Sequence, residues 1–265
     1  MSTLELEARL DNLLSTSQKE TEDIDLFAPI TDREECPICM LPLPITGETL
    51  FMTCCGKRIC QGCAFKDIMT KFNNGVPDDE HPCAFCRQKA NVQNCLKEIK
   101  KLLKTNNAEA FIQMAIYYKQ GDGGVMQSDT KALEMRIRAA ELGNADAFIH
   151  IGYHCITVEQ DKSKGLAFYE VAAKKGSVLA HLHLADFHSK NGNTQIGIKH
   201  LRIGASAGDQ KAMDGLMKCY KNKLLTKEEL AQTLRAFQAS SDAMKSKDRD
   251  DERAVRQRHG VIGYG

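Results

Sequence analysis

Four closely spaced pairs of cysteines constrain the fold of this chain more than any other feature. The pairs are Cys36/Cys39, Cys54/Cys55, Cys60/Cys63 and Cys83/Cys86. Proline and glycine interrupt the stretches between them, so little room is left for a hydrophobic core. About fifty residues of this kind rarely bury enough apolar surface to offset the conformational entropy of the chain. The segment therefore needs covalent cross-links or bound metal ions to stabilise its fold.

Cysteine pairs with this spacing are typical of structural zinc sites. In a Cys-x2-Cys pair, a tight turn points both sulfur atoms to the same side, where they suit a tetrahedral zinc ion. The four pairs predict two zinc ions, with the first and third pairs on one ion and the second and fourth pairs on the other. This cross-brace would tie distant loops together in place of a core, and structural zinc contributes on the order of 10 kcal/mol to folding.

The pair Cys54/Cys55 is unusual because its two residues are direct neighbours. Two sulfur atoms on one tetrahedral zinc ion lie about 3.8 Å apart, and consecutive Cα atoms have about the same separation. Both cysteines can therefore bind one ion. The alternative is that one of them is a packed or free thiol and that His81 completes the second site.

Nearby cations could balance the charge of these sites. A zinc ion with four thiolates carries a net double negative charge, which positive side chains would offset. Candidates near the cysteines in sequence are Lys57, Arg58, Lys66 and Arg87. Lys57 is not expected to be a ligand itself, because its amine is protonated at neutral pH.

Residues 107–239 repeat one helical pattern. Alanine recurs in a single register at spacings of 37, 33 and 32 residues, and a large apolar residue follows each alanine four positions later. Small residues let two helices approach closely, and glycine after the second helix supplies a left-handed C-cap. Periods of this length predict stacked antiparallel helical hairpins, an α-solenoid. The register consists of Ala110/Met114, Ala147/Ile151, Ala180/Leu184 and Ala212/Leu216, with Gly143, Gly176 and Gly208 as helix ends.

These patterns predict a mainly α protein in four parts. Residues 1–32 form an acidic arm whose leucines at helical spacing favour a short amphipathic helix, either solvated or docked on a partner. Residues 33–90 form the zinc module, named here the cysteine module, and residues 91–240 form the repeat array. Residues 241–265 mix charges without an apolar pattern, so a disordered tail is expected there.

Composition narrows the classes of partner and the compartment. The net charge is +1 and Trp is absent, which argues against nucleic acid as a partner. No apolar run is long enough to span a bilayer, and charges interrupt the first residues, unlike a secretory signal. An intracellular location, cytoplasmic or nuclear, is therefore expected, without membrane partners. In a reducing compartment the 11 cysteines favour metal binding or free thiols over disulfides.

Two stretches resemble known families. The motif CPIC…CCGKRICQGC…CAFCR resembles the RING family of cross-braced zinc domains, in an all-cysteine form. The stretch AFIQMAIYYKQGDGGVMQSDTKALEMRIRAAELG resembles a Sel-one-like repeat, a relative of the tetratricopeptide repeat. RING domains commonly act as ubiquitin ligases, which bind a ubiquitin-conjugating enzyme and promote transfer without a covalent intermediate. The resemblances therefore imply a conjugating enzyme and protein substrates as partners, and no nucleophilic catalytic residue.

The RING resemblance also implies roles for residues that do not bind zinc. Ile38 matches the exposed apolar position between the first two ligands, and Phe65 or Ile68 would line the same groove from a short helix after Cys63. Arg87, directly after the last ligand, matches the basic position that contacts ubiquitin. The chain departs from the family at Lys57 and Ala84, where histidine and proline are frequent, respectively.

Two functions from different classes fit this pattern. One is a RING-type ubiquitin ligase whose repeats recruit substrates, and the other is a non-catalytic, zinc-stabilised adaptor between proteins. A redox enzyme is disfavoured because the Cys-x2-Cys pairs lack a βαβ context. Histidines in the array are interpreted as surface or groove residues and not as ligands, namely His150, His154, His181, His183 and His188.

Overall fold

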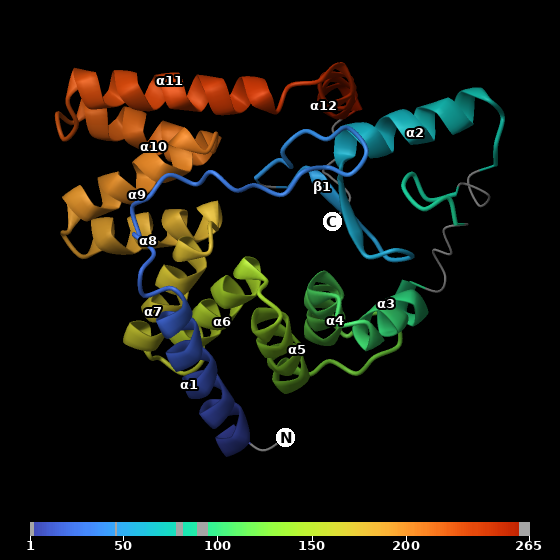
Figure 1. Cartoon of the computed structure of the whole chain (residues 1–265), viewed down its shortest axis with the longest axis horizontal. Helices are drawn as coiled ribbons and strands as arrows, with labels where there is room; N and C mark the ends of the chain where they lie inside the picture. The colour runs from blue at the N-terminus through green and yellow to red at the C-terminus, as the bar shows by residue number, and fades with distance from the viewer. Residues whose placement is uncertain (1–2, 46, 78–81, 89–94, 260–265) are drawn as a thin grey trace. The chain divides into compact units, whose positions relative to one another are not determined.

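The computed structural model describes residues 3–45, 47–77, 82–88 and 95–259, and this part of the chain is mainly helical (Figure 1). Two compact units alternate along the sequence. The first unit contains residues 1–32 and 111–240, and the second contains residues 33–110 and 241–265. The acidic arm thus belongs with the repeat array, and the segment after the array belongs with the cysteine module. Helix α3 (Cys95–Lys104), expected within the array, lies in the second unit.

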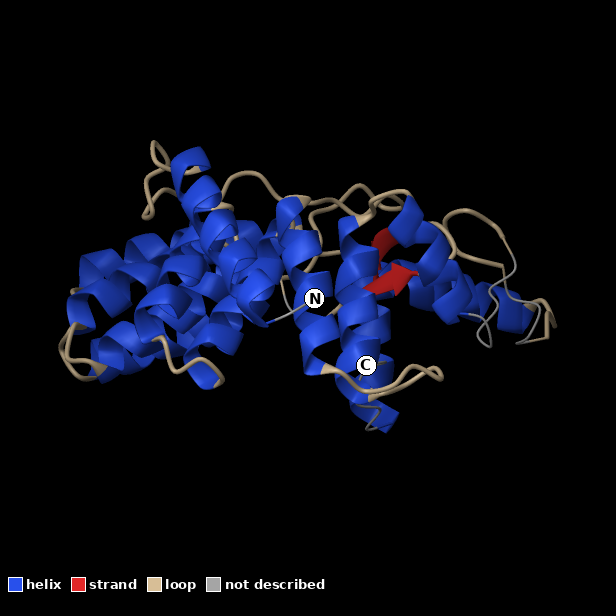
Figure 2. Ribbon diagram, turned by 90° about the horizontal axis from the view of Figure 1, so that it is seen from below, coloured by secondary structure: helices blue, strands red, loops and turns tan. Residues whose placement is uncertain are grey.

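The repeat array consists of helices joined by short loops, drawn in blue and tan in Figure 2. Neighbours along the chain pack against each other from α5 to α10. Short connections of this kind make successive helices antiparallel, as the α-solenoid prediction requires. The helices are α4 (Ala108–Gln120), α5 (Asp129–Glu141), α6 (Ala145–Thr157), α7 (Lys162–Lys174), α8 (Val178–Lys190), α9 (Thr194–Ser206), α10 (Gln210–Lys221) and α11 (Lys227–Ala243).

The alanine register is confirmed. All four alanines are completely buried, and their apolar partners are at most 2% exposed. The three glycines that end the preceding helices have φ of 87°, 88° and 97°, the left-handed conformation expected of a C-cap. A polar residue three positions before each alanine accepts a hydrogen bond from the backbone N–H of that alanine, as N-caps do. The pairs are Asn107/Ala110, Asn144/Ala147, Ser177/Ala180 and Asp209/Ala212.

Helices α6 and α7 approach each other closely because each carries a glycine at their crossing. A Cβ added at Gly152 would lie 2.8 Å from the carbonyl oxygen of Gly165 and 2.8 Å from the ring of Tyr169. A Cβ at Gly165 would lie 2.7 Å from the carbonyl oxygen of Gly152. Neither backbone can yield without moving a whole helix, so this crossing depends on the absence of side chains.

We expect Gly152→Ala to destabilise the repeat array by roughly 1–3 kcal/mol through overpacking, although alanine has the higher helix propensity by about 1 kcal/mol. Gly215→Ala in α10 is the matched control, because its Cβ would meet only the side chain of Leu201, at 3.2 Å. Urea unfolding followed by circular dichroism measures both variants. Equal stability of the two variants would contradict the close crossing.

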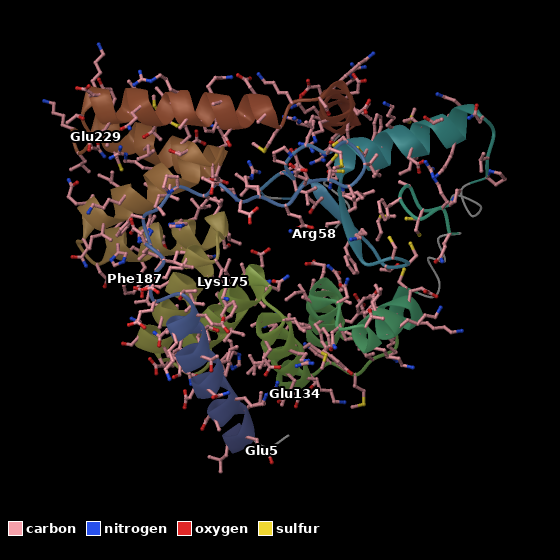
Figure 3. All side chains as sticks on the ribbon, viewed as in Figure 1. Glu5, Arg58, Glu134, Lys175, Phe187 and Glu229 are labelled. Atoms are coloured by element: carbon pink, nitrogen blue, oxygen red, sulfur yellow. The ribbon has the colours of Figure 1, made fainter. Side chains whose placement is uncertain are left out.

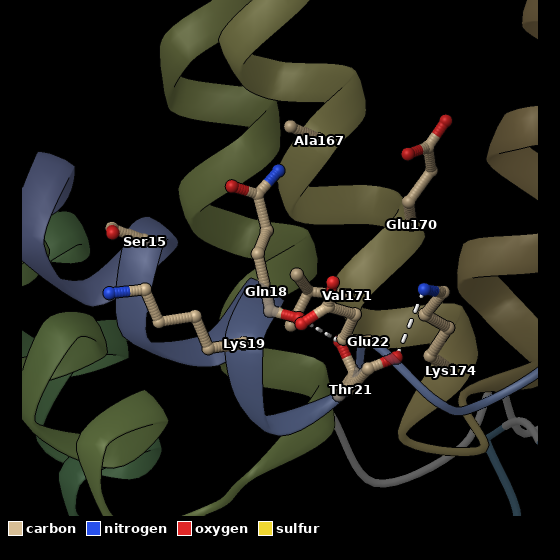
Figure 4. Close-up of a pocket in the computed structure, with 9 residues that line it drawn as sticks. All are labelled: Ser15, Gln18, Lys19, Thr21, Glu22, Ala167, Glu170, Val171 and Lys174. Atoms are coloured by element: carbon tan, nitrogen blue, oxygen red, sulfur yellow. Dashed lines mark hydrogen bonds between the residues drawn. The ribbon is translucent and has the colours of Figure 1, made fainter.

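Helix α1 (Thr3–Glu20) lies on the repeat array and not free in solvent. Leu6, Leu10 and Leu13 are buried, and the helix packs against α5 and α7. Three ion pairs hold its polar side: Arg9–Glu141, Asp11–Lys164 and Glu20–Lys175. At its C-terminal end, Lys174 Nζ donates to the carbonyl oxygen of Thr21 at 3.0 Å, beside a pocket between α1 and α7 (Figure 4). The arm is therefore an integral layer of the array.

The interpretation of the array histidines as surface or groove residues is wrong for His181. Its side chain is buried, as is that of His200 on the neighbouring helix α9. Their Nδ1 atoms lie 2.9 Å apart, so one ring donates a hydrogen bond to the other. Phe27, from the segment after α1, packs on His200 with ring centroids 5.0 Å apart. Mutual hydrogen bonding and this aromatic cover let two polar rings occupy a core position.

The cysteine module contains one antiparallel hairpin, β1 (Thr49–Met52) and β2 (Lys57–Cys60), followed directly by α2 (Gln61–Asn73). The prediction of a disordered tail over 241–265 is wrong for α12 (Lys247–His259), which packs against α2. The physical reason is a buried arginine, Arg249, that anchors an otherwise polar helix. In the described part of the chain, no helix is long and apolar enough to cross a membrane.

Candidate metal centre

Two cysteine turns in the module have the same backbone geometry. In the first, Cys36 N donates to Leu41 O at 2.9 Å, and Met40 N donates to Cys36 O at 2.8 Å. In the second, Cys83 N donates to Gln88 O at 2.7 Å, and Arg87 N donates to Cys83 O at 3.0 Å. Met40 and Arg87 occupy equivalent positions with φ of 58° and 63°. Each turn points two sulfur atoms inward, as the Cys-x2-Cys spacing predicts.

The adjacent cysteines Cys54 and Cys55 lie in the turn of the β1–β2 hairpin. Cys55 N and Gly56 N both donate to Met52 O, at 3.2 Å and 2.7 Å. Gly56 has φ of 69°, and a Cβ there would lie 2.5 Å from the side-chain amide of Asn107, which donates to Gly56 O. This tight turn is how two neighbouring residues present their sulfur atoms to one site.

The third pair, Cys60 and Cys63, lies at the N-terminus of α2. Cys60 is the N-cap, and its sulfur accepts from Cys63 N at 3.4 Å. Cys60 N in turn donates to the sulfur of Cys36 at 3.4 Å. Burial raises the pKa of the Cys60 thiol, and the hydrogen bond from Cys63 N at the positive end of the helix dipole offsets part of this rise.

The sulfur atoms gather into two groups of four, in the pairing that the cross-brace predicts. Within each group all four sulfur atoms lie within 4.8 Å of one another, and each group could hold a metal ion. The distances from Cys39 to Cys60 and from Cys54 to Cys86, 3.9 Å and 3.5 Å, suit the tetrahedral spacing of about 3.8 Å for zinc. His81, the alternative ligand, lies outside the described residues. The groups are Cys36/Cys39/Cys60/Cys63, named site 1, and Cys54/Cys55/Cys83/Cys86, named site 2.

The electrostatics of both groups favour a bound cation. Burial and then the neighbouring thiols raise the pKa of Cys54 and of Cys63, and burial raises the pKa of Cys55 to about 11. Burial also opposes ionisation of Cys36, but backbone N–H groups from Cys60 and Cys39 outweigh it and lower its pKa to about 7. One thiol of site 1 is thus ready to ionise, whereas full ionisation of either group requires a metal ion.

The cations expected to balance the thiolates are mostly engaged elsewhere. Arg58, which projects from the hairpin in Figure 3, pairs with Glu34 at 2.6 Å. Lys66 pairs with Asp248 at 3.0 Å, and Arg87 pairs with Asp67 at 3.0 Å. Lys57 is exposed.

Among the described residues, the guanidinium that contacts a cysteine sulfur is that of Arg249, whose Nη2 lies 3.5 Å from Cys39 Sγ. Sequence reasoning missed this residue because it follows the module by the whole length of the repeat array.

The residues expected to contact a conjugating enzyme occupy both cysteine turns and α2. Ile38 and Ile68 are 40% and 42% exposed, and Phe65 is half-buried. The side chain of Arg87 is mostly exposed although it pairs with Asp67. Asp67 and Lys71 tie α2 to the second turn, because Asp67 holds Arg87 and Lys71 donates to Pro82 O. Site 1 ties α2 to the first turn. Further exposed apolar residues of these three segments are Met40, Met69, Phe72 and Phe85.

Comparisons with known proteins bear on the fold. A Sel1 repeat protein from Oxalobacter formigenes has a similar structure, with a TM-score of 0.50 and 18% identity over 74% of this chain and 87% of that chain. A protective antigen of uropathogenic Escherichia coli, c5321, described as displaying an SLR fold, has a TM-score of 0.45 and 17% identity over 77% and 50% of the two chains. The immunity protein PA5088 from Pseudomonas aeruginosa has a TM-score of 0.46 and 14% identity over 76% and 74%.

The likeness to the Oxalobacter protein shows that the helical part of the chain has the Sel1-repeat fold, as the first repeat indicated. No family model matches the sequence, and no curated protein matches it either.

Proposed function

We propose that this protein is a RING-type, zinc-binding ubiquitin ligase. In this proposal the cysteine module holds two zinc ions and binds a ubiquitin-conjugating enzyme, and the repeat array binds protein substrates. The observation that carries the proposal is the exposure of Ile38 between two cysteines of site 1. Ile38 is accompanied by exposed apolar residues on the cysteine turns and α2, among them Met40, Ile68 and Phe85. A patch of exposed apolar side chains is typical of a protein-binding site.

The neighbourhood of Ile38 supports a docking surface for a protein. Large apolar side chains are exposed on the first cysteine turn, on α2 and on the second cysteine turn. These segments are linked through site 1 and through the Arg87–Asp67 ion pair. Zinc would supply structure and not chemistry, since it would fix both turns so that apolar anchors stand in the correct relation.

The Sel1-repeat fold of the array supports the second half of the proposal. Stacked helical hairpins expose extended surfaces that are suited to binding other proteins. The array would hold the substrate while the cysteine module holds the loaded conjugating enzyme. Transfer then depends on proximity, because no nucleophile of this chain takes part.

Ile38→Ala is expected to abolish detectable binding of the conjugating enzyme. Loss of an interface anchor costs more than about 1 kcal/mol, which makes a weak complex undetectable. The measurement is discharge of ubiquitin from a loaded conjugating enzyme onto free lysine, together with direct binding. Ile116→Ala is the matched control, since Ile116 is 38% exposed on α4. If the wild type accelerates discharge with no enzyme of a broad panel, the ligase proposal fails.

Arg87→Ala is expected to spare binding and to slow transfer. The proposed role of Arg87 is to donate charge-assisted hydrogen bonds to the loaded ubiquitin and so restrict it to a reactive pose. The side chain of Arg87 is 67% exposed, although that of Asp67 is only 18% exposed, so solvent screens the Arg87 end of the pair and the guanidinium can turn to a stronger partner. Neither substitution touches a cysteine, so both variants should retain two zinc ions. Loss of binding in Arg87→Ala would contradict the separate roles.

A non-catalytic adaptor is the second candidate, and one observation favours it. Asp67 already occupies the guanidinium of Arg87, the residue on which acceleration of transfer would depend. An adaptor would bind its partners through the same surfaces. Binding of a conjugating enzyme without faster discharge would select this function.

A further inference from the structure

The strongest unexplained feature of the second unit is a buried positive charge. Arg249 is only 3% exposed, although it lies on α12, a helix dominated by charged residues. Its Nη1 donates to Pro42 O at 3.0 Å and to Met244 O at 2.8 Å, and its Nη2 approaches Cys39 Sγ at 3.5 Å. Its Nε has no hydrogen-bond partner in the described part of the chain.

No carboxylate of the described residues balances the charge of this guanidinium. Among the described residues, no Asp or Glu lies within ion-pair distance of Arg249. Burial of an unpaired cation is strongly destabilising, so a counter-charge is required. The anionic candidates that act on Arg249 are Cys60 and Cys39, both in site 1. Four thiolates on one zinc ion supply a net double negative charge at this place.

The sequence of α2 allows α12 to approach site 1 closely. A Cβ added at Gly62 would lie 2.7 Å from the backbone nitrogen of Arg249, so glycine between Cys60 and Cys63 admits the helix. Lys66 pairs with Asp248, and Arg256 donates to the side chain of Gln61. Ser246 caps α12 by accepting from Arg249 N at 3.3 Å. These contacts place the guanidinium against the sulfur atoms and not against solvent.

A second arginine lies close to the first. Burial, and then the charge of Arg249, lower the pKa of Arg33. Arg33 donates to Leu43 O and to the sulfur of Met244, both of which adjoin the contacts of Arg249. Two neighbouring guanidinium groups repel each other, and the lowered pKa of Arg33 reflects both burial and this repulsion.

We propose that Arg249 is the charge-balancing hydrogen-bond donor to the thiolates of site 1 and that α12 is thereby a structural part of that zinc centre. The inference rests on the proposed zinc occupancy and not on ubiquitin transfer. Arg249 is a positioning residue: it does not bind the metal, but it donates to Cys39 and offsets the charge of the four sulfur atoms. Outer-shell partners of this kind typically change metal affinity by about 10-fold to 100-fold.

The test is the rate of zinc release from the full-length, zinc-loaded protein to an excess of chromophoric chelator. Two phases are expected, one for each site. A Cys86→Ser variant, which has no complete site 2, identifies the phase that belongs to site 1. Arg249→Met should accelerate that phase by about tenfold or more and leave the other phase unchanged. Arg249→Lys, which keeps the charge, should give an intermediate rate.

Arg253→Met is the matched control on the same helix, because Arg253 is 42% exposed and pairs with Glu48 and Asp250. The control should release zinc at the wild-type rate. A second readout is the sulfur-to-metal charge-transfer band of the cobalt(II)-substituted protein. Loss of a hydrogen bond to a thiolate should move the band of site 1 to lower energy in Arg249→Met alone.

Three outcomes would overturn the inference: an unchanged site 1 phase, an equal acceleration by Arg253→Met, or a wild-type protein without zinc in site 1. If Arg249→Met does not fold, the zinc-release rate and the cobalt charge-transfer band of Arg249→Lys test the inference in its place. Wild-type protein that binds two zinc ions but promotes no ubiquitin transfer would contradict the ligase proposal and leave this inference standing.

Discussion

Chelation of zinc is expected to unfold the cysteine module and to leave most helices of the repeat array folded. Three of the six buried residues in the hydrophobic cluster of the module are cysteines of site 1, namely Cys36, Cys60 and Cys63. Without metal, the remaining buried apolar residues of this cluster are Leu43, Ile59 and Ala64, too few to hold fifty residues together. The lost stabilisation is on the order of 10 kcal/mol, which is comparable to the whole unfolding free energy of a typical domain, about 5–15 kcal/mol.

The measurement combines metal analysis, circular dichroism and limited proteolysis before and after addition of a strong chelator. Two zinc ions per chain are expected, with cleavage after chelation confined to the cysteine module and α12. Cys55→Ser should lower the stoichiometry, whereas Cys219→Ser, outside both groups, should not. One ion per chain would contradict the cross-brace, and a loss caused by His81→Ala but not by Cys55→Ser would select the alternative ligand set.

Acidification is expected to destabilise the repeat array through its two buried histidines. Burial lowers the pKa of His181 to about 4. Burial, followed by the charges of His181 and His188, lowers the pKa of His200 to about 3. Below the ordinary pKa of 6.5, the unfolded chain binds protons that the folded array excludes, so stability is lost as the pH falls from 6.5 towards these values. Each histidine contributes about 1.4 kcal/mol per pH unit in this window.

Urea unfolding at pH 7.5, 6.0 and 5.0 tests this expectation. His200→Gln removes one titrating ring and keeps a side chain that can hydrogen-bond to His181. Because one titrating ring remains, the loss of unfolding free energy on acidification that these two histidines cause should be about half as steep in the variant as in the wild type. Acid also releases zinc from thiolates, but that effect is common to both proteins and cancels in the difference between them. Equal slopes would show that the buried rings do not control the pH response.

The sequence predicted the parts of this fold that depend on repeated local chemistry. Cysteine spacing indicated which sulfur atoms meet, because a turn of fixed length fixes the direction of two side chains. The alanine register indicated the core of the array, since alanine and a large residue one turn later occupy the same helix face. N-cap residues three positions before each alanine carried the same signal, and the sequence reasoning did not use it.

The features that sequence reasoning missed depend on single, non-repeating contacts. Helix α12 has no apolar stripe, and its docking relies on one buried arginine that meets sulfur atoms far away in sequence. His181 is polar, and only the position of His200 on α9 makes its burial favourable. Neither the residue type nor the sequence position of Arg249 or His181 indicates that its side chain is buried.

The alternation of the two units along the chain has a consequence for the order of synthesis. The cysteines of both sites emerge from the ribosome before the repeat array, and Arg249 emerges after it. Zinc capture during translation would therefore precede arrival of the guanidinium, so the nascent site 1 would hold its ion with an uncompensated charge. On this view, the charge of site 1 is balanced only after the whole repeat array, which lies between the cysteines and Arg249 in sequence, has been synthesised.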